Sequence, residues 1–138
     1  MIGVRGLYLS VVLAGLVGIG IPVAATAYSS LASAPTSPQT TMVQIQMDAG
    51  ITPGGNLGFS PTVVKVVIGV NNTIQWTNDD SAPHTATSLS VPSGASSFDS
   101  GMLNPGAWYT VTLTVAGTYK YHCSYHSWMT GEIEVIAG

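Results

Sequence analysis

The chain has 138 residues, enough for one ordinary domain with a tail but too few for the several cores of a multidomain enzyme. Charged residues make up only 7%, the formal net charge is -3, and hydrophobic residues reach 46%. This balance excludes nucleic-acid binding and a disordered acidic tail. The single cysteine, Cys123, excludes an internal disulfide framework and a covalently attached c-type haem.

Residues 1–28 have the features of a signal peptide or a membrane anchor. Residues 6–27 carry no charge and follow Arg5, the only basic residue before Lys65. A helix of that length spans the roughly 30 Å core of a bilayer, which indicates an uncleaved anchor. A cleaved signal is the alternative, because Ala25-Thr26-Ala27 has the small-x-small form of a signal-peptidase site. A buried core helix is a weaker alternative, because the segment contains several glycines and a proline.

Both main interpretations predict an N-terminal hydrophobic helix and export to a periplasmic or extracytoplasmic space. A retained anchor also predicts membrane association through residues 6–27, at the outer face of the cell membrane. Residues 29–41 follow as a predicted linker, because nine of these thirteen residues are Ser, Thr or Pro and none is charged. The folded domain is predicted at residues 42–138.

From residue 42 onward the sequence has the pattern of short strands. Val43, Ile45 and Met47 alternate with polar residues, which predicts a strand with one buried face. Further β-rich runs, bounded by Gly, Pro, Asn and Asp, predict strands at residues 62–70, 73–77, 84–88, 109–115, 117–122 and 131–137. About seven such strands, without a sustained helical period, predict an all-β domain that forms a sandwich or a small barrel.

Residues that suit a metal ion gather near the C-terminus. Cys123, His126 and Met129 place a thiolate, an imidazole and a thioether at three-residue intervals, at the end of one predicted strand and in the following loop. A fourth donor must come from elsewhere, and His84 is the best candidate because it follows the Ala82-Pro83 turn. One Cys, two His and a weak Met suit copper, whereas zinc prefers four strong ligands.

Several segments in chain order also carry a family pattern. They are Phe59-Ser60-Pro61, Thr73-Ile74-Gln75-Trp76-Thr77-Asn78-Asp79-Asp80, Ala82-Pro83-His84-Thr85, Phe98-Asp99-Ser100-Gly101 and Gly117-Thr118-Tyr119-Lys120-Tyr121-His122-Cys123, which leads to His126, Met129 and Gly131. With these segments, residues 59–135 resemble a small blue (type 1) copper protein, a cupredoxin of the plastocyanin and amicyanin group. The two-residue gap between His126 and Met129 is similar to that of amicyanin.

The resemblance implies a Greek-key β-sandwich or barrel of about 7–8 strands and a single type 1 copper ion. It assigns the copper ligands to His84, Cys123, His126 and Met129, and it assigns no catalytic residue. The activity implied is one-electron transfer between larger redox partners, and the chain is not expected to be an enzyme. A copper-binding chaperone or store, and a metal-free cell-surface module, are the alternative functions.

The resemblance also assigns the surface-reaching ligand to His126, so a redox donor and acceptor are expected to dock near His126 and Trp128. Ser127, Pro53 and Pro105 extend the predicted uncharged patch. Packing of Trp128 over the ligand loop is an equal alternative to partner contact.

Two positions depart from the family pattern. Tyr125 stands where many relatives carry Pro, so its backbone N–H is predicted to donate to the Cys123 sulfur. Thr85 stands where related proteins commonly carry Asn, and the hydroxyls of Thr85 and Ser124 are predicted to bridge the two ligand loops instead. His122 precedes Cys123 in a strand, so its side chain is expected on the opposite face, away from the metal.

Overall fold

The computed structural model describes residues 37–51, 53 and 57–138. These residues form eight strands and no helix: β1 (Thr40–Ile45), β2 (Phe59–Ser60), β3 (Val63–Val67), β4 (Thr73–Asn78), β5 (Thr87–Ser90), β6 (Trp108–Thr112), β7 (Gly117–His122) and β8 (Thr130–Ile136). The predicted targeting segment, its hydrophobic helix and most of the linker lie outside the described residues. Within the described part of the chain, no helix has the length and hydropathy needed to cross a membrane.

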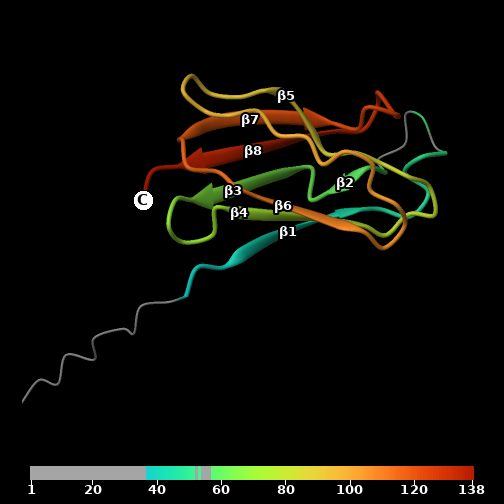
Figure 1. Cartoon of the computed structure of the whole chain (residues 1–138), viewed down its shortest axis with the longest axis horizontal. Helices are drawn as coiled ribbons and strands as arrows, with labels where there is room; N and C mark the ends of the chain where they lie inside the picture. Colours follow the sequence, from blue (N-terminus) through green and yellow to red (C-terminus); the bar gives the residue numbers. More distant parts are fainter. Residues whose placement is uncertain (1–36, 52, 54–56) are drawn as a thin grey trace, which may run out of the picture. The chain divides into compact units, whose positions relative to one another are not determined.

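The strands are arranged in two four-stranded sheets (Figure 1). Sheet A has the order β2-β1-β4-β6, and sheet B has the order β3-β8-β7-β5. β1 pairs with β4 and β3 pairs with β8 in parallel, while the other neighbouring strands are antiparallel. The prediction of an all-β domain with about seven or eight strands is therefore confirmed.

The core between the sheets is built from side chains at alternate strand positions. In β4, Ile74 and Trp76 are fully buried, whereas the residues beside them in the strand are partly exposed. Tyr121 of sheet B packs edge-on against Trp76 of sheet A, with ring centroids 5.3 Å apart. Gly131 pairs with Tyr121 in the register of β7 and β8, and a Cβ at Gly131 would collide with this ring. Each large apolar side chain buried here stabilises the fold by about 1.5–3 kcal/mol.

β1 differs from its prediction at both ends. It begins at Thr40, two residues before the predicted domain boundary at Met42, because Thr40 already pairs in parallel with the first residue of β4. It ends at Ile45, and Met47 is 57% exposed rather than buried with the rest of the alternating pattern. The chain turns here, since Asp48 has a φ of 66°, which no strand residue adopts.

The segment around His84 also differs from its prediction. The strand expected at residues 84–88 is displaced to β5, and His84 forms only an isolated bridge, through two backbone hydrogen bonds with Leu103. Asn78, the last residue of β4, holds this loop by donating to the carbonyls of Ala82 (2.8 Å) and Leu103 (2.9 Å). Leu103 is therefore the backbone partner of His84, and β5 pairs with β7 only from Thr87 onward.

Candidate metal centre

The loop of residues 123–129 joins β7 to β8 and closes on itself. The Cys123 N–H donates to the Met129 carbonyl (3.1 Å), the Met129 N–H to His126 (2.9 Å) and the His126 N–H to Cys123 (3.3 Å). His122 and Thr130, the residues just outside the loop, form the last pair of the β7–β8 register. The three-residue spacing of Cys123, His126 and Met129 therefore reflects two consecutive turns of the loop, each closed by a backbone hydrogen bond.

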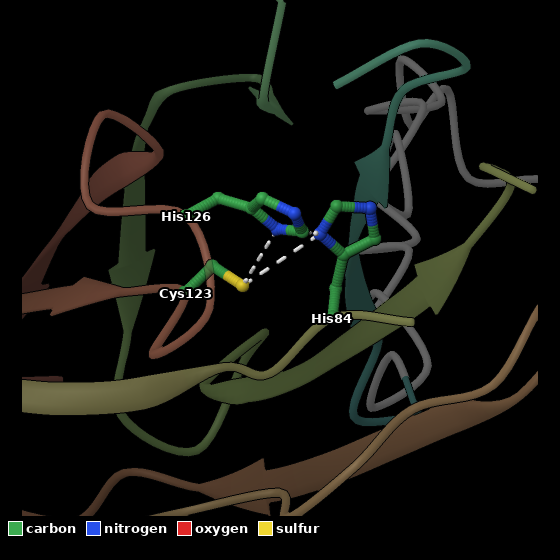
Figure 2. Close-up of side chains that lie close together, drawn as sticks. All are labelled: His84, Cys123 and His126. Atoms are coloured by element: carbon green, nitrogen blue, oxygen red, sulfur yellow. Dashed lines mark hydrogen bonds between the residues drawn. The ribbon is translucent and has the colours of Figure 1, made fainter. Parts of the chain in front are cut away.

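His84, Cys123 and His126 form one cluster of metal-ligating atoms (Figure 2). The Cys123 Sγ lies 3.6 Å from Nδ1 of His84 and 3.5 Å from Nδ1 of His126, and the two Nδ1 atoms are 3.1 Å apart. Ligands bound to one ion by bonds of about 2.0–2.3 Å lie roughly 3.5–4 Å apart in a trigonal arrangement. The two sulfur–nitrogen separations fall in that range, and the nitrogen–nitrogen separation of 3.1 Å is shorter.

The cluster is more buried on one side than on the other. His84 and Cys123 have no exposed surface, whereas His126 is partly exposed. Burial and the neighbouring His84 lower the pKa of His126 from its ordinary value, against an opposing effect of Asp80. The neutral, metal-binding form of the imidazole is therefore favoured at His126.

Met129 is buried in the same loop, with 1% of its surface exposed. Its side chain packs against Gly58, where a Cβ would lie 3.7 Å from the Met129 Cγ. His122 lies outside the cluster and is partly exposed, as its position in β7 predicts.

Asp80, which the sequence analysis did not select, is an outer neighbour of the cluster. Asp80 is buried, with 3% of the residue exposed. Its carboxylate accepts hydrogen bonds from four donors: the N–H groups of Ser81 (2.7 Å), Asp48 (3.0 Å) and Gly50 (3.0 Å), and Nε2 of His84 (2.8 Å). Burial alone raises the pKa of this carboxyl, but the hydrogen bonds outweigh burial and hold the pKa well below its usual range. Asp80 lies four residues before His84, and outside a helix this spacing alone does not predict a contact.

The Cys123 sulfur accepts a hydrogen bond from a different residue than predicted. The Thr85 N–H lies 3.4 Å from Sγ, directly after the His84 position. No hydrogen bond from the Tyr125 N–H to this sulfur occurs among residues 37–51, 53 and 57–138, so the Tyr125 prediction is wrong. The backbone hydrogen bonds within the loop join Cys123 to His126 and Met129 and do not involve the Tyr125 N–H.

The predicted hydroxyl bridge between the two ligand loops is confirmed. The Ser124 N–H donates to Thr85 Oγ1 (2.8 Å), and the Thr85 hydroxyl donates to Ser124 Oγ (3.2 Å). Thr87 extends the bridge, with its hydroxyl 2.9 Å from that of Thr85 and 3.1 Å from that of Ser124. Three small side chains therefore connect the loop of His84 to the loop of Cys123.

Trp128 packs over the ligand loop. Its indole N–H donates to the Ala49 carbonyl (3.0 Å), and its ring centroid lies 5.2 Å from that of His126. Gly50, in the same turn as Ala49, also lies against the His126 ring, since a Cβ there would lie 3.3 Å from the His126 Cε1. The turn after β1 thus forms one wall around His126.

A two-sheet β domain with a buried cysteine between two imidazoles is typical of one class of small metalloprotein, and similar proteins of known sequence and structure belong to that class. The family described as "Cupredoxin-like domain" matches residues 19–135. Amicyanin from Paracoccus denitrificans is 32% identical over 68 residues, which cover 49% of this chain and 52% of amicyanin. Plastocyanin from Sambucus nigra is 37% identical over 91 residues, 59% of this chain and 90% of plastocyanin.

Among solved structures, a purple cupredoxin from Nitrosopumilus maritimus aligns with a TM-score of 0.57 and 31% identity, over 70% of this chain and 99% of that protein. The chain therefore belongs to the cupredoxin family of small blue copper proteins. It spans about half the length of the Paracoccus amicyanin. Type 1 copper is the cofactor that this family implies, and a soft thiolate between two imidazole nitrogens is a donor set that fits it.

Proposed function

We propose that the chain is an exported one-electron carrier with a type 1 copper ion held by His84, Cys123, His126 and Met129. The observation that carries the proposal is the buried cluster of one thiol and two Nδ1 atoms, 3.1 to 3.6 Å apart. Bound copper supplies the one-electron chemistry of the Cu(II)/Cu(I) couple. The chain's residues hold the donors, exclude water and keep the site the same in both states.

Rigidity of the cluster supports a carrier rather than an enzyme. The hydroxyl bridge of Thr85, Thr87 and Ser124 fixes one loop to the other, and the Thr85 N–H stabilises charge on the Cys123 sulfur. A site whose donors are fixed in advance rearranges little when an electron arrives or leaves. The four proposed ligands also leave no donor position for a substrate.

We infer that both redox partners dock near His126 and Trp128, where the cluster comes nearest to solvent. Two exposed side chains near His126 are uncharged: Tyr125 is 50% exposed, with its ring centroid 6.5 Å from that of His126, and Ile51 is 73% exposed next to Gly50. A small uncharged patch suits a transient encounter, in which fast release matters more than affinity. Trp128 braces this surface, since its indole N–H donates a hydrogen bond to the Ala49 carbonyl.

The proposed organisation of the chain follows from this function. Residues 1–28 serve as a signal peptide or an anchor, residues 29–41 as the linker, and residues 42–138 as the redox domain, with β1 reaching back to Thr40. Export to a periplasmic or extracytoplasmic space brings the carrier to the exported partners that it serves. A retained anchor at residues 6–27 holds it at the outer face of the membrane.

A titration of the full chain with Cu(II), followed by optical and EPR spectroscopy, tests the proposed function. One equivalent is expected to produce an intense blue charge-transfer band, and Cys123→Ser is expected to abolish it. His122→Asn is the matched control, because His122 precedes Cys123 but lies outside the cluster, and it should keep the band. A colourless complex contradicts the carrier and favours a copper store, while failure to bind copper favours a metal-free module.

A further inference from the structure

Asp80 is the most constrained polar side chain beside the proposed copper site. Its side chain is 2% exposed, and its two oxygens accept from four donors. Oδ1 accepts from Asp48 and Ser81, and Oδ2 accepts from Gly50 and His84. A carboxylate is the side-chain group that accepts at both oxygens, because an amide of the same shape donates from one of the two positions.

This arrangement fixes the tautomer of His84. The carboxylate only accepts, so the His84 imidazole carries its proton on Nε2 and donates it across 2.8 Å. The lone pair is then on Nδ1, the atom that lies 3.6 Å from the Cys123 sulfur and 3.1 Å from Nδ1 of His126. The nitrogen that a metal needs therefore carries no proton before any metal binds.

The same carboxylate also reaches the surroundings of the second imidazole. The carboxylate accepts hydrogen bonds from the N–H groups of Asp48 and Gly50, which belong to the turn after β1. Gly50 also faces the His126 ring. Asp80 comes from the loop after β4, about 30 residues further along the chain. One side chain thus joins the His84 loop to the turn that borders His126.

We propose that Asp80 is a positioning residue that presents Nδ1 of His84 to the copper and braces the turn beside His126. This inference rests on the proposed ligand role of His84. Hydrogen bonding of a ligating imidazole to a carboxylate raises the basicity of the ligand, which favours the more positive metal ion. Asp80 therefore stabilises Cu(II) relative to Cu(I) and lowers the reduction potential.

The first test compares Asp80→Asn with Asp79→Asn in the copper-loaded full chain. Both variants remove one negative charge from adjacent positions, but Asp79 is exposed and Asp80 is buried. Asp80→Asn is expected to shift the Cu(I):Cu(II) ratio at a fixed mediator potential about tenfold toward Cu(I), which is about 59 mV. Asp79→Asn should shift it less than about twofold. Equal shifts, or no shift in Asp80→Asn, overturn the proposal.

The second test uses the wild-type protein without copper, so it does not depend on whether a variant folds. Nitrogen-15 NMR of the wild-type apoprotein is expected to find His84 protonated at Nε2, with an imidazole proton that exchanges slowly with water. A proton on Nδ1, or rapid exchange, overturns the positioning role of Asp80. The two proposals fail separately, because absence of a blue band in the wild type contradicts the ligand set while this NMR measurement still reports on Asp80.

Discussion

The two imidazoles of the proposed copper site are held in contrasting ways. His84 is fully buried, and its Nε2 donates to the Asp80 carboxylate at 2.8 Å. His126 is partly exposed, and no hydrogen bond of its Nε2 occurs within the described part of the chain. Its ring is held by neighbours instead, with Trp128 at 5.2 Å between centroids and Gly50 at the Cε1 edge.

The contrast indicates a division of tasks within one site. Polar bonds from a buried carboxylate fix His84, so this side sets the geometry and the charge around the donors. Packing against a tryptophan and a glycine leaves His126 partly exposed, and the proposed function places electron transfer to a partner on this side. Variants near His84 should therefore affect the stability of the fold and the reduction potential. Variants near His126 should affect the access of small molecules and partners to the site.

The largest difference is expected between His84→Gly and His126→Gly. His84→Gly leaves a buried carboxylate without one donor and opens a cavity, so it should lower the free energy of unfolding by about 3 kcal/mol or more. His126→Gly removes a partly exposed ring and should cost about 1 kcal/mol. Urea denaturation of the two apoproteins measures both values.

Added imidazole sharpens the same comparison in the copper-loaded variants. Free imidazole should enter the opening left by His126→Gly and restore much of the blue band, because that side borders solvent. It should not restore the band in His84→Gly, where the opening is enclosed. Equal rescue of both variants would show that the two sides are equally accessible and contradict the comparison.

A smaller effect is expected for the hydroxyl bridge on the buried side. Thr85→Val keeps the shape of the side chain but removes the acceptor of the Ser124 N–H and a partner of the Thr87 hydroxyl. It should lower the free energy of unfolding by about 1–2 kcal/mol. Thr112→Val is the control, because the Thr112 hydroxyl pairs with Thr73 at an exposed position, and it should cost less than about 0.5 kcal/mol. Similar losses would show that the bridge adds nothing to stability.

The ligand loop and the bridge show what the sequence can predict, from a local pattern in one case and from a family pattern in the other. Cys123 and His126 could be chosen from the sequence because one short loop carries them, so their spacing reflects their geometry. Thr85 and Ser124 were predicted as partners through the family pattern, which placed their loops together. β4, β7 and β8 could also be predicted from local sequence, because buried and more exposed residues alternate along each of these strands.

Asp80 could not be chosen in this way, because three of its four donors are backbone N–H groups and two of these come from a turn about 30 residues earlier. Backbone donors leave no trace in residue types. The displacement of β5 has a similar origin, since the pairing of His84 with Leu103 depends on a distant carbonyl that Asn78 also holds. β2 has only two residues, too few for any period.

A still smaller effect is expected on the exposed side of the site. Trp128→Phe keeps an aromatic ring beside His126 but removes the indole hydrogen bond to Ala49. It should lower the free energy of unfolding by about 1 kcal/mol and broaden the NMR signals of the His126 ring. Trp108→Phe, at a 63% exposed position, is the control and should change stability by less than about 0.5 kcal/mol. Unchanged His126 signals in Trp128→Phe would contradict the supporting role of Trp128.

The smallest effect concerns the approach of a partner to His126. Ile51→Asp places a negative charge next to Gly50, on the uncharged surface, and Val70→Asp places the same charge on the turn before β4, at the end of that strand away from His84. Because two copies of the protein repel each other at the docking surface, Ile51→Asp should slow electron self-exchange about threefold at low salt. Val70→Asp should leave the rate within about 1.5-fold of the wild-type rate. Its charge lies about one strand length, roughly 20 Å, from the end of β4 that carries the site. Equal slowing in both variants would mean that net charge, and not the position of His126, controls the encounter.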